Sequence, residues 1–425
     1  KVILADGGVL RATGTEGKSG KVVLNSTDAD LDNEHGIELN SGGLIDVASA
    51  DGAKGEVVLR ALRVDSDNNG TDDDIAIASI NADIVGADRF HAEGVKIYTG
   101  DDLQISGQIR QADINKFKAD TDQYMSLAIR QDVETRLGSS VHLRPGIEVQ
   151  QQGDLSLNEK LDTVDWRYAS IWDTAEKSFD PAVGQVVLRA SGDLNINKTI
   201  TDGYKLFFGM FDQLQSGQSW GVNLVAGADL NSANGQATQQ NTGDINIASN
   251  VTIRTGTGDL NIVAGKDINF ADVSSVVYSA GRATKINPYG SLTDSVIFTL
   301  PFFGGVPEFP IDGGDVSFVA GANINGIAND NQYTDDWLLR VSPLLFSGGE
   351  TIPTIWGIKA DGFKQNIGSF GGGTVNVVAG SDINDLSVMM PTTGKPVGET
   401  MPGSQGFVFE ENKVEINGGG NMFVS

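Results

Sequence analysis

Short alternations of apolar and polar residues, separated by turn residues, run through almost the whole chain. Between residues 243 and 268 four such alternations follow one another, and Gly, Asp, Asn or Lys stands at each break. An alternation of period two predicts a β-strand, and strands of three to five residues with a turn at every corner predict a coil. The pattern therefore predicts a rung of a β-solenoid, an all-β fold in which parallel strands of successive rungs stack on one another.

The same pattern divides the chain into three stretches. Residues 1–110 predict regular rungs, because short strands with one apolar and one polar face alternate with Gly-containing gaps. Residues 111–182 predict further rungs with two insertions, at about 111–138 and about 158–182. Near-helical spacing of the apolar residues in the first insertion favours a short helix or another excursion from the coil.

The clearest repeat lies in residues 183–425 and has the form Val-Ala-Gly-x-Asp, with Asn replacing Asp in one copy. The copies begin at Val225, Val263, Val319 and Val378. The steps between them are 38, 56 and 59 residues. The first step is close to two rungs of about 19 to 20 residues, a size within the range of solenoid repeats. Insertions rich in aromatic residues are predicted at about 201–219, 274–312 and 329–370.

Two interpretations of the aromatic insertions are open. The aromatic side chains could cover the flank of the coil or cap its groove, as ordered insertions in solenoids do. Alternatively, they could form a contact surface for a neighbouring chain or a glycan, because large apolar residues outside the regular rungs mark interaction sites.

The recurring acidic residues predict structure and not catalysis. An active site would occur once, whereas a turn residue recurs at equivalent corners, as we expect for Asp193, Asp229, Asp267 and Asp382. The three histidines, His35, His91 and His142, are scattered over the first third of the chain. No Ser/His/Asp or metal-binding triad is evident. We therefore predict that the chain is not an enzyme, although parallel β-helices do host polysaccharide-cleaving sites.

The most specific short motif is an acidic turn at residues 65–74. Its Asp-x-Asp-x-Asn-Gly-x-x-Asp spacing places oxygen atoms at alternate positions around a turn, which suits a Ca²⁺ ion. The predicted ligands are Asp65, Asp67, Asn69 and Asp73. An EF-hand loop would carry a Glu at the position of Ala76, so the motif is closer to shorter Ca²⁺ loops. The competing interpretation is a solvated acidic corner. A second acidic run, residues 28–34, lacks Gly and is a weaker candidate.

Composition narrows the possible partners. The 425 residues include 56 acidic and 30 basic side chains, which give a formal charge of −26. This charge argues against binding to nucleic acids or to anionic membranes. There are 54 Gly and no Cys, so disulfides cannot contribute. No apolar run approaches the roughly 20 residues that span a bilayer. Because the chain begins at Lys1 within a strand-like pattern, we expect it to be part of a longer protein.

The repeat region resembles the large exoproteins of the filamentous haemagglutinin family. The similarity is carried by an ordered series of segments, because a single Ala-Gly-x-Asp-Ile is a weak signal. It covers roughly residues 183–395, and residues 1–182 are compatible but less distinctive. The segments are 254–268, 277–282, 313–321, 336–338, 363–373 and 379–387.

This resemblance implies a right-handed parallel β-helix exported by a two-partner-secretion transporter in the outer membrane. It also implies a secreted or cell-surface location on a bacterium and a role as a fibrous structural protein or adhesin. Its partners would be other copies, or the glycans and proteins of host or neighbouring cells, in attachment, biofilm or fibre assembly. The family's secretion domain is not recognisable in the chain. Two alternatives stay open, a carbohydrate-binding or -cleaving β-helix and the stalk of a contact-dependent toxin.

Overall fold

The computed structural model describes most of the chain. The described residues are 1–425 without 15–19, 28–35, 51, 53–54, 67–69, 139, 174–177, 208–210, 285–307, 329–333, 342–354 and 401–406.

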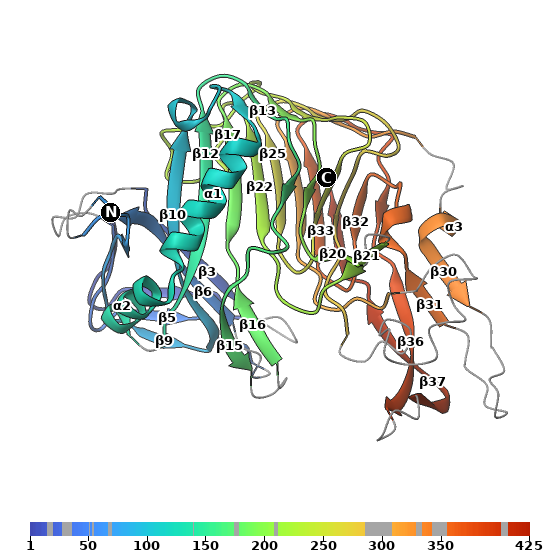
Figure 1. The fold of residues 1–425 in the computed structure, drawn as a ribbon, viewed down its shortest axis with the longest axis horizontal. Coiled ribbons are helices and arrows are strands. Elements are labelled where there is room, and N and C mark those ends of the chain that lie inside the picture. Colours follow the sequence, from blue (N-terminus) through green and yellow to red (C-terminus); the bar gives the residue numbers. More distant parts are fainter. Residues whose placement is uncertain are drawn as a thin grey trace.

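One long sheet of parallel strands runs through the molecule and gives it its shape (Figure 1). In bonding order its strands are β3 (Lys21–Asn25), β6 (Gly55–Val64), β10 (Ala87–Thr99), β12 (His142–Gln151), β17 (Gln185–Ala190), β22 (Gly221–Ala226), β25 (Leu260–Ala264), β28 (Val316–Ala320), β33 (Thr374–Ala379) and β38 (Asn421–Val424). The short β7 (Asp74–Ile75) pairs antiparallel with β6.

Two further parallel sheets accompany the long sheet over its later part. The second sheet contains β11 (Gln108–Ile109), β13 (Leu155–Leu157), β18 (Leu194–Ile196), β23 (Ile245–Ile247), β26 (Ile268–Phe270), β29 (Ile324–Asn325) and β34 (Ile383–Asn384). The third contains β14 (Leu161–Asp162), β19 (Ile200–Thr201), β24 (Thr252–Thr255), β27 (Val276–Ser279), β32 (Ile367–Ser369) and β35 (Val388–Met389). From β13 to β38 the chain visits the second, third and long sheets in turn.

The first part of the chain follows the same order with two smaller sheets. These are β1 (Val2–Leu4), β4 (Ile37–Leu39) and β8 (Ile77–Ile80), and β2 (Val9–Arg11), β5 (Leu44–Asp46) and β9 (Asp83–Val85). After β11 the chain forms helices α1 (Gln111–Tyr124) and α2 (Leu127–Leu137) before it returns to the long sheet at β12. In the sequence, the helices therefore separate the strands of the two smaller sheets from those of the second and third sheets. Residues 111–138, where helical spacing was predicted, are indeed mostly helical.

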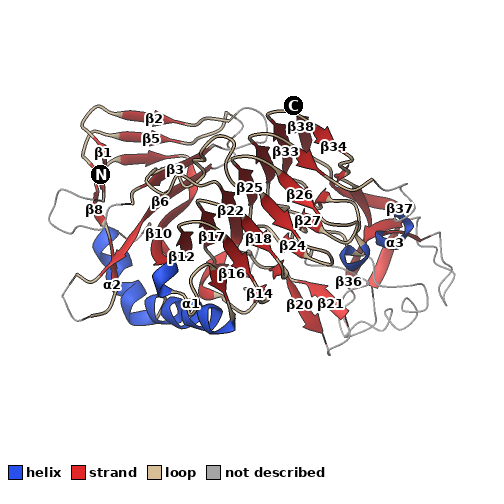
Figure 2. Ribbon diagram, turned by 90° about the horizontal axis from the view of Figure 1, so that it is seen from above, coloured by secondary structure: helices blue, strands red, loops and turns tan. Residues whose placement is uncertain are grey.

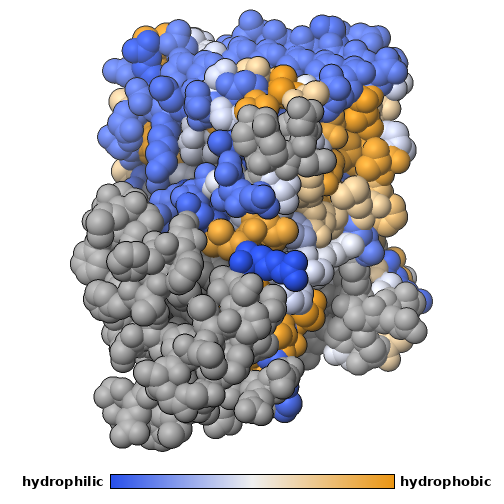
Figure 3. Space-filling view, turned by 90° about the vertical axis from the view of Figure 1, so that its right-hand side faces the viewer, coloured by the Kyte–Doolittle hydropathy of each residue, from blue (hydrophilic) through white to orange (hydrophobic). Residues whose placement is uncertain are grey.

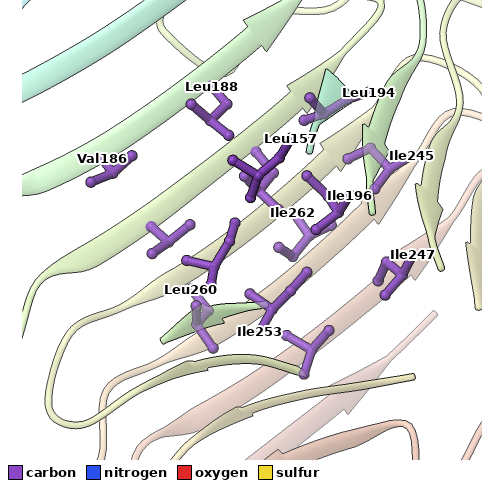
Figure 4. Close-up of a cluster of buried hydrophobic side chains, with 14 of the residues drawn as sticks. Leu157, Val186, Leu188, Leu194, Ile196, Ile245, Ile247, Ile253, Leu260 and Ile262 are labelled. Atoms are coloured by element: carbon purple, nitrogen blue, oxygen red, sulfur yellow. The ribbon is translucent and has the colours of Figure 1, made fainter. Parts of the chain in front are cut away.

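Hydrophobic residues fill the space between the sheets in straight rows. Val186, Val222, Leu260, Val316 and Val375 are paired from strand to strand and are all buried. Their neighbours across the interior come from the second and third sheets, including Leu194, Ile196, Ile245 and Ile253 (Figure 4). Burying each such side chain contributes about 1.5–3 kcal/mol. A separate cluster of the same kind fills the first part of the chain, around Ile37, Leu39, Val57 and Leu59.

The prediction of a mostly β chain built on parallel strands is confirmed at that level, but the prediction that the 38-residue step holds two rungs is wrong. Val225 on β22 pairs directly with Val263 on β25, so their 38-residue separation spans one turn and not two. The shortest turn, from Ile367 on β32 to Val388 on β35, takes 21 residues. The 38-residue step is longer because residues 227–244 form a loop between β22 and β23.

Most insertions of the described chain lie where the third sheet passes to the long sheet. Three such passages carry a hairpin. The hairpins are β15 (Tyr168–Asp173) with β16 (Ser178–Ala182), β20 (Tyr204–Phe207) with β21 (Phe211–Leu214), and β36 (Thr392–Thr400) with β37 (Phe407–Gly418). Between β29 and β32 lie α3 (Thr334–Trp337), β30 (Leu338–Val341) and β31 (Ile355–Ile358), and β31 pairs with β36. Seen from above, α1, α2 and β20–β21 line the same side of the molecule (Figure 2).

Among the described residues, no helix combines the length and apolar character that crossing a bilayer would require.

Candidate functional sites

The structure describes only part of the acidic turn. Asp67 and Asn69 lie outside the described residues, whereas Asp65 and Asp73 are half-buried. Asp65 Oδ2 accepts a hydrogen bond of 2.7 Å from the backbone N–H of Gly70, whose φ of +84° suits glycine. The Asp65 carboxylate therefore closes the turn, as an aspartate at the start of a loop commonly does.

Basic side chains neutralise the other acids of this turn. Lys96 Nζ, from β10, lies 3.1 Å from Asp72 Oδ2, and Arg136, from α2, forms an ion pair with Asp74. Within the described part of the chain, no three acidic or histidine side chains converge as a metal site would require. Calcium binding by Asp65, Asp67, Asn69 and Asp73 stays a prediction, since two of these ligands are not described.

The recurring corner residues form a hydrogen-bonded ladder on the outside of the second sheet. The Oδ1 atom of each residue accepts the backbone N–H of the corresponding residue in the next turn, over 2.8–3.2 Å. The members of this aspartate ladder are Asp154, Asp193, Asp244, Asp267, Asn323 and Asp382. A second ladder two positions along joins the side-chain amides of Asn195, Asn246, Asn269, Asn325 and Asn384.

One residue predicted at these corners is misplaced. Asp229 is not in the ladder, and its position is taken by Asp244. The loop that follows β22 carries Asp229 away from the corner, where its side chain instead accepts the N–H of Asn231. Asp193, Asp267 and Asp382 do occupy equivalent corners.

Sequence reasoning missed a buried network of charges on the outer face of the long sheet. Arg60 donates to Glu93 at 3.0 Å and to Glu148 at 2.9 Å. Arg144 donates to Glu93 at 2.8 Å and to Glu56 at 3.1 Å. Arg189 donates to Glu148 at 2.9 Å. Glu93 and Glu148 are 0 % and 1 % exposed.

The network also reaches a distant part of the chain. Lys21, on the first strand of the long sheet, lies 3.3 Å from Glu56 and 3.1 Å from Asp259, which immediately precedes β25. Asn25 donates to the carbonyl of Ala233 at 2.6 Å, and Arg189 donates to the carbonyl of Asp229 at 2.7 Å. The loop between β22 and β23 therefore covers one side of the network.

Electrostatics keep the carboxylates of Glu56 and Glu148 ionised despite their burial. Burial by itself would raise the pKa of Glu56, but Arg144 and Lys21 outweigh it and lower the pKa to about 2. Burial likewise opposes ionisation of Glu148, and Arg60 with Arg189 lowers its pKa below the ordinary value. One feature of the sequence could have indicated this network. Arg60 and Arg63 interrupt an otherwise apolar run, and a charged side chain buried in such a run needs a partner of opposite charge.

A second polar cluster lies on the outer face of the third sheet. Arg254 on β24 forms an ion pair with Asp212, donates to Thr201 Oγ1 at 2.7 Å, and stacks 4.3 Å from the centre of the Tyr204 ring. Glu308 accepts the backbone N–H of Leu214 at 3.0 Å and the hydroxyl of Tyr204 at 3.2 Å. Burial raises the pKa of Glu308 to about 7.

Aromatic rings cover this cluster. Tyr278, Trp337, Phe363 and Phe370 are at most 3 % exposed, and the ring centres of Phe363 and Phe370 lie 5.1–5.7 Å from each other and from those of Tyr278 and Trp337. Gly368 lies beneath them, where a Cβ would come within 3.0 Å of the Phe363 and Phe370 rings. For these residues the structure favours the interpretation that aromatic side chains cover the flank of the coil.

The histidines are less scattered than their sequence positions indicate. His91 and His142 are paired on β10 and β12, and their ring centres lie 6.4 Å apart. His35 lies outside the described residues. No acid–base or nucleophilic arrangement around the described pair assigns it a catalytic role.

Comparisons with known proteins do not add to this picture. No family model, no curated protein and no solved structure matches the chain.

Proposed function

We propose that the chain is a right-handed parallel β-helix that serves a bacterium as a fibrous secreted or cell-surface structural protein or adhesin. The observation that carries the proposal is the use made of the repeated residues. The recurring Asp and Asn side chains form hydrogen bonds between successive turns, so they stabilise a scaffold.

The placement of the insertions supports a role in display. Three hairpins emerge at the same passage, from the third sheet to the long sheet, in different turns of the chain. A solenoid that tolerates insertions at one corner presents them side by side on one flank, as repeat proteins present their binding surfaces. The regular turns would supply the scaffold, and the hairpins would supply contacts with host or neighbouring cells.

The resemblance to filamentous haemagglutinin-like exoproteins supports the same role. On this proposal an outer-membrane two-partner-secretion transporter exports the protein, and surface glycans or proteins are its ligands. Calcium at the acidic turn would fit an extracellular setting, where Ca²⁺ sites of modest affinity are filled.

An adhesion assay tests the proposal. Beads coated with the purified chain should bind bacterial or host cells, and replacing residues 168–182 by a short Gly-Ser linker should lower binding. The thermal unfolding midpoint of that variant, followed by circular dichroism, should stay close to that of the wild type, because the hairpin β15–β16 lies outside the long, second and third sheets. A matched control is Leu127→Ser, at a side chain of α2 that is 59 % exposed.

Two results would argue against an adhesin. Beads that bind no cell or glycan surface would remove the display role. Release of reducing ends from a polysaccharide by the purified chain would favour the alternative of a glycan-cleaving β-helix.

A further inference from the structure

One face of the antiparallel sheet β30–β31–β36–β37 carries a continuous row of four residues. Arg340 on β30 lies directly opposite Trp356 on β31, and Trp356 lies opposite Gly394 on β36. Gly394 in turn lies opposite Ile416 on β37. Residues that are directly opposite on neighbouring strands point to the same face of a sheet. The side chains of this row, here called the tryptophan platform, therefore stand side by side.

The indole of Trp356 lies flat on the gap that Gly394 leaves in the row. A Cβ atom on Gly394 would come within 2.6–2.7 Å of three adjacent carbons in the six-membered ring of the indole. Nearly equal distances to three adjacent atoms mean that the face of the ring, and not its edge, rests on the glycine. The opposite face of the ring points away from the sheet, and Trp356 is half-buried. By contrast, Trp166, Trp220 and Trp337 are at most 4 % exposed.

Arg340 supplies the platform with an unpaired positive charge. Its side chain is exposed, and within the described chain no carboxylate pairs with it. Most described arginines do form such a pair, as Arg136 does with Asp74. A cation that the chain leaves unpaired can bind an anionic group of a ligand without first breaking an internal contact.

The platform continues as apolar surface beyond the glycine. Ile416 is 56 % exposed. On the side of the molecule where β30, β31 and β36 lie in Figure 1, apolar and strongly hydrophilic residues reach the surface next to one another (Figure 3). An exposed apolar surface beside a single charge is a common composition of a ligand-binding site.

A saccharide unit with a carboxylate fits these groups. The C–H groups on one side of a pyranose ring carry a slight positive charge and the face of an indole is negative, so the two stack. A guanidinium binds a carboxylate through two parallel hydrogen bonds. Arg340, which neighbours Trp356 in the row, can therefore bind the acid group of a sugar that lies on the indole.

Other ligands fit the platform less well. An alkyl chain would cover the apolar residues but leave the charge of Arg340 unused. An extended peptide would need partners for its backbone N–H and C=O groups, which this row of side chains does not offer. A polyanion would be repelled by a chain whose net charge is −26. A single carboxylate is repelled less, because salt screens charges that lie more than roughly 10 Å away.

We propose that the tryptophan platform binds a carboxylate-bearing saccharide, with the sugar ring stacked on Trp356 and its carboxylate bound by Arg340. Gly394 is required because any larger side chain would push the indole off the sheet. The inference deepens the proposed function and rests on it, because it assigns a class of glycan and a place on the molecule to the adhesive contact.

Calorimetric titration of the whole chain with two pairs of saccharides tests the proposal. The pairs are sialyllactose with lactose, and digalacturonic acid with maltose, so that each acidic sugar has a neutral counterpart. At least one acidic saccharide should bind, and more tightly than its counterpart. Arg340→Gln should lower the affinity for the acidic saccharide by about 10- to 100-fold and leave the neutral one unchanged, because only a charge-assisted pair is lost. Trp356→Ala should abolish binding of both.

Two further variants guard against effects of folding. Arg110→Gln changes an exposed arginine directly before α1 and should bind like the wild type. Trp356→Phe keeps an aromatic face and should retain part of the affinity that Trp356→Ala loses. If the thermal unfolding midpoint of Trp356→Ala is lowered, Trp356→Phe and Arg340→Gln carry the test instead.

Three results would overturn the inference. They are a wild-type chain that binds neither acidic saccharide, an Arg340→Gln variant that binds them as tightly as the wild type, and tighter binding of a hexaglutamate peptide than of either saccharide. The last result would identify an acidic peptide as the ligand. Cell binding without saccharide binding would leave the proposed function intact, and saccharide binding by a chain that holds no cell would leave only the platform.

Discussion

Glu308 is a carboxyl group held between segments that are distant in the sequence. Its two oxygens accept hydrogen bonds from Leu214 and Tyr204, and its backbone N–H donates to the carbonyl of Ile358. Burial raises its pKa to about 7, although both hydrogen bonds and Arg254 act in the opposite direction, and Asp361 raises it further. The protonation state of one side chain thus bears on how three insertions hold together.

This arrangement predicts a pH-dependent stability. A carboxyl group whose pKa rises from 4.5 to about 7 on folding stabilises the fold fully below pH 4.5 and loses that contribution as pH rises through 7. The free energy of unfolding should therefore decrease by an amount on the order of 1–3 kcal/mol as the pH is raised from 5 to 8. The thermal unfolding midpoint should decrease with it. Glu308→Gln should flatten this slope in circular dichroism melts, and the exposed Glu415→Gln should not. Parallel slopes for all three proteins would contradict the assignment.

Calcium binding at the acidic turn is a prediction for calorimetry. Titration of the purified chain with CaCl₂ should release or absorb heat that disappears in the variant Asp65→Ala with Asp67→Ala, because two oxygen ligands are lost. Asp28→Ala with Asp30→Ala is the matched control in the second acidic run. Heats that are the same with and without Asp65 and Asp67 would dismiss the site.

At the scale of secondary structure, the sequence predicted strand positions better than their connections. Period-two alternation depends on which face of a strand is buried, and this is a local property. The positions of strands β23 to β26 could therefore be predicted from the sequence. The number of residues per turn is not local. It depends on where loops leave the coil, and residues 227–244 doubled the apparent spacing between Val225 and Val263 without adding a rung.

The difference between local and non-local information also explains which residues of the candidate sites were not predicted from the sequence. Asp244 enters the ladder, and Asp229 does not, because of loop length and not residue type. The cluster around Arg254 and Glu308 combines residues brought together by three insertions, whose docking has no periodic signal. In contrast, helical spacing was visible in residues 111–138, because an amphipathic helix carries its pattern within one segment.

At the scale of the molecule, the buried charges join the first turns of the chain to its middle. Arg60, Glu93, Arg144 and Glu148 come from three neighbouring strands, and Lys21 extends the network to Asp259, 238 residues away. Buried ion pairs contribute little compared with apolar residues of the same size, but breaking one leaves a charge without compensation. The network therefore fixes one particular packing of these segments.

Removing one carboxylate should show this. Glu148→Gln leaves Arg60 and Arg189 without their shared partner, and we expect a loss of about 3–5 kcal/mol in the free energy of unfolding, measured in urea. Glu38→Gln, in the partly exposed pair with Lys1, should cost no more than about 1 kcal/mol. Equal losses in the two variants would show that the network has no special role.

The contacts of Lys21 and Asn25 also determine how the chain would respond to a pulling force. A tether at the first residues of a simple stack of turns would peel the strands away one after another. Here Lys21 and Asn25 bind Asp259 and the carbonyl of Ala233, so tension applied at β3 also passes directly to the middle of the chain. The turns formed by β6, β10 and β12 are thereby shielded from part of that tension. If the protein is an adhesin, as proposed, and holds a cell against flowing liquid, these contacts make the first turns a mechanical clamp.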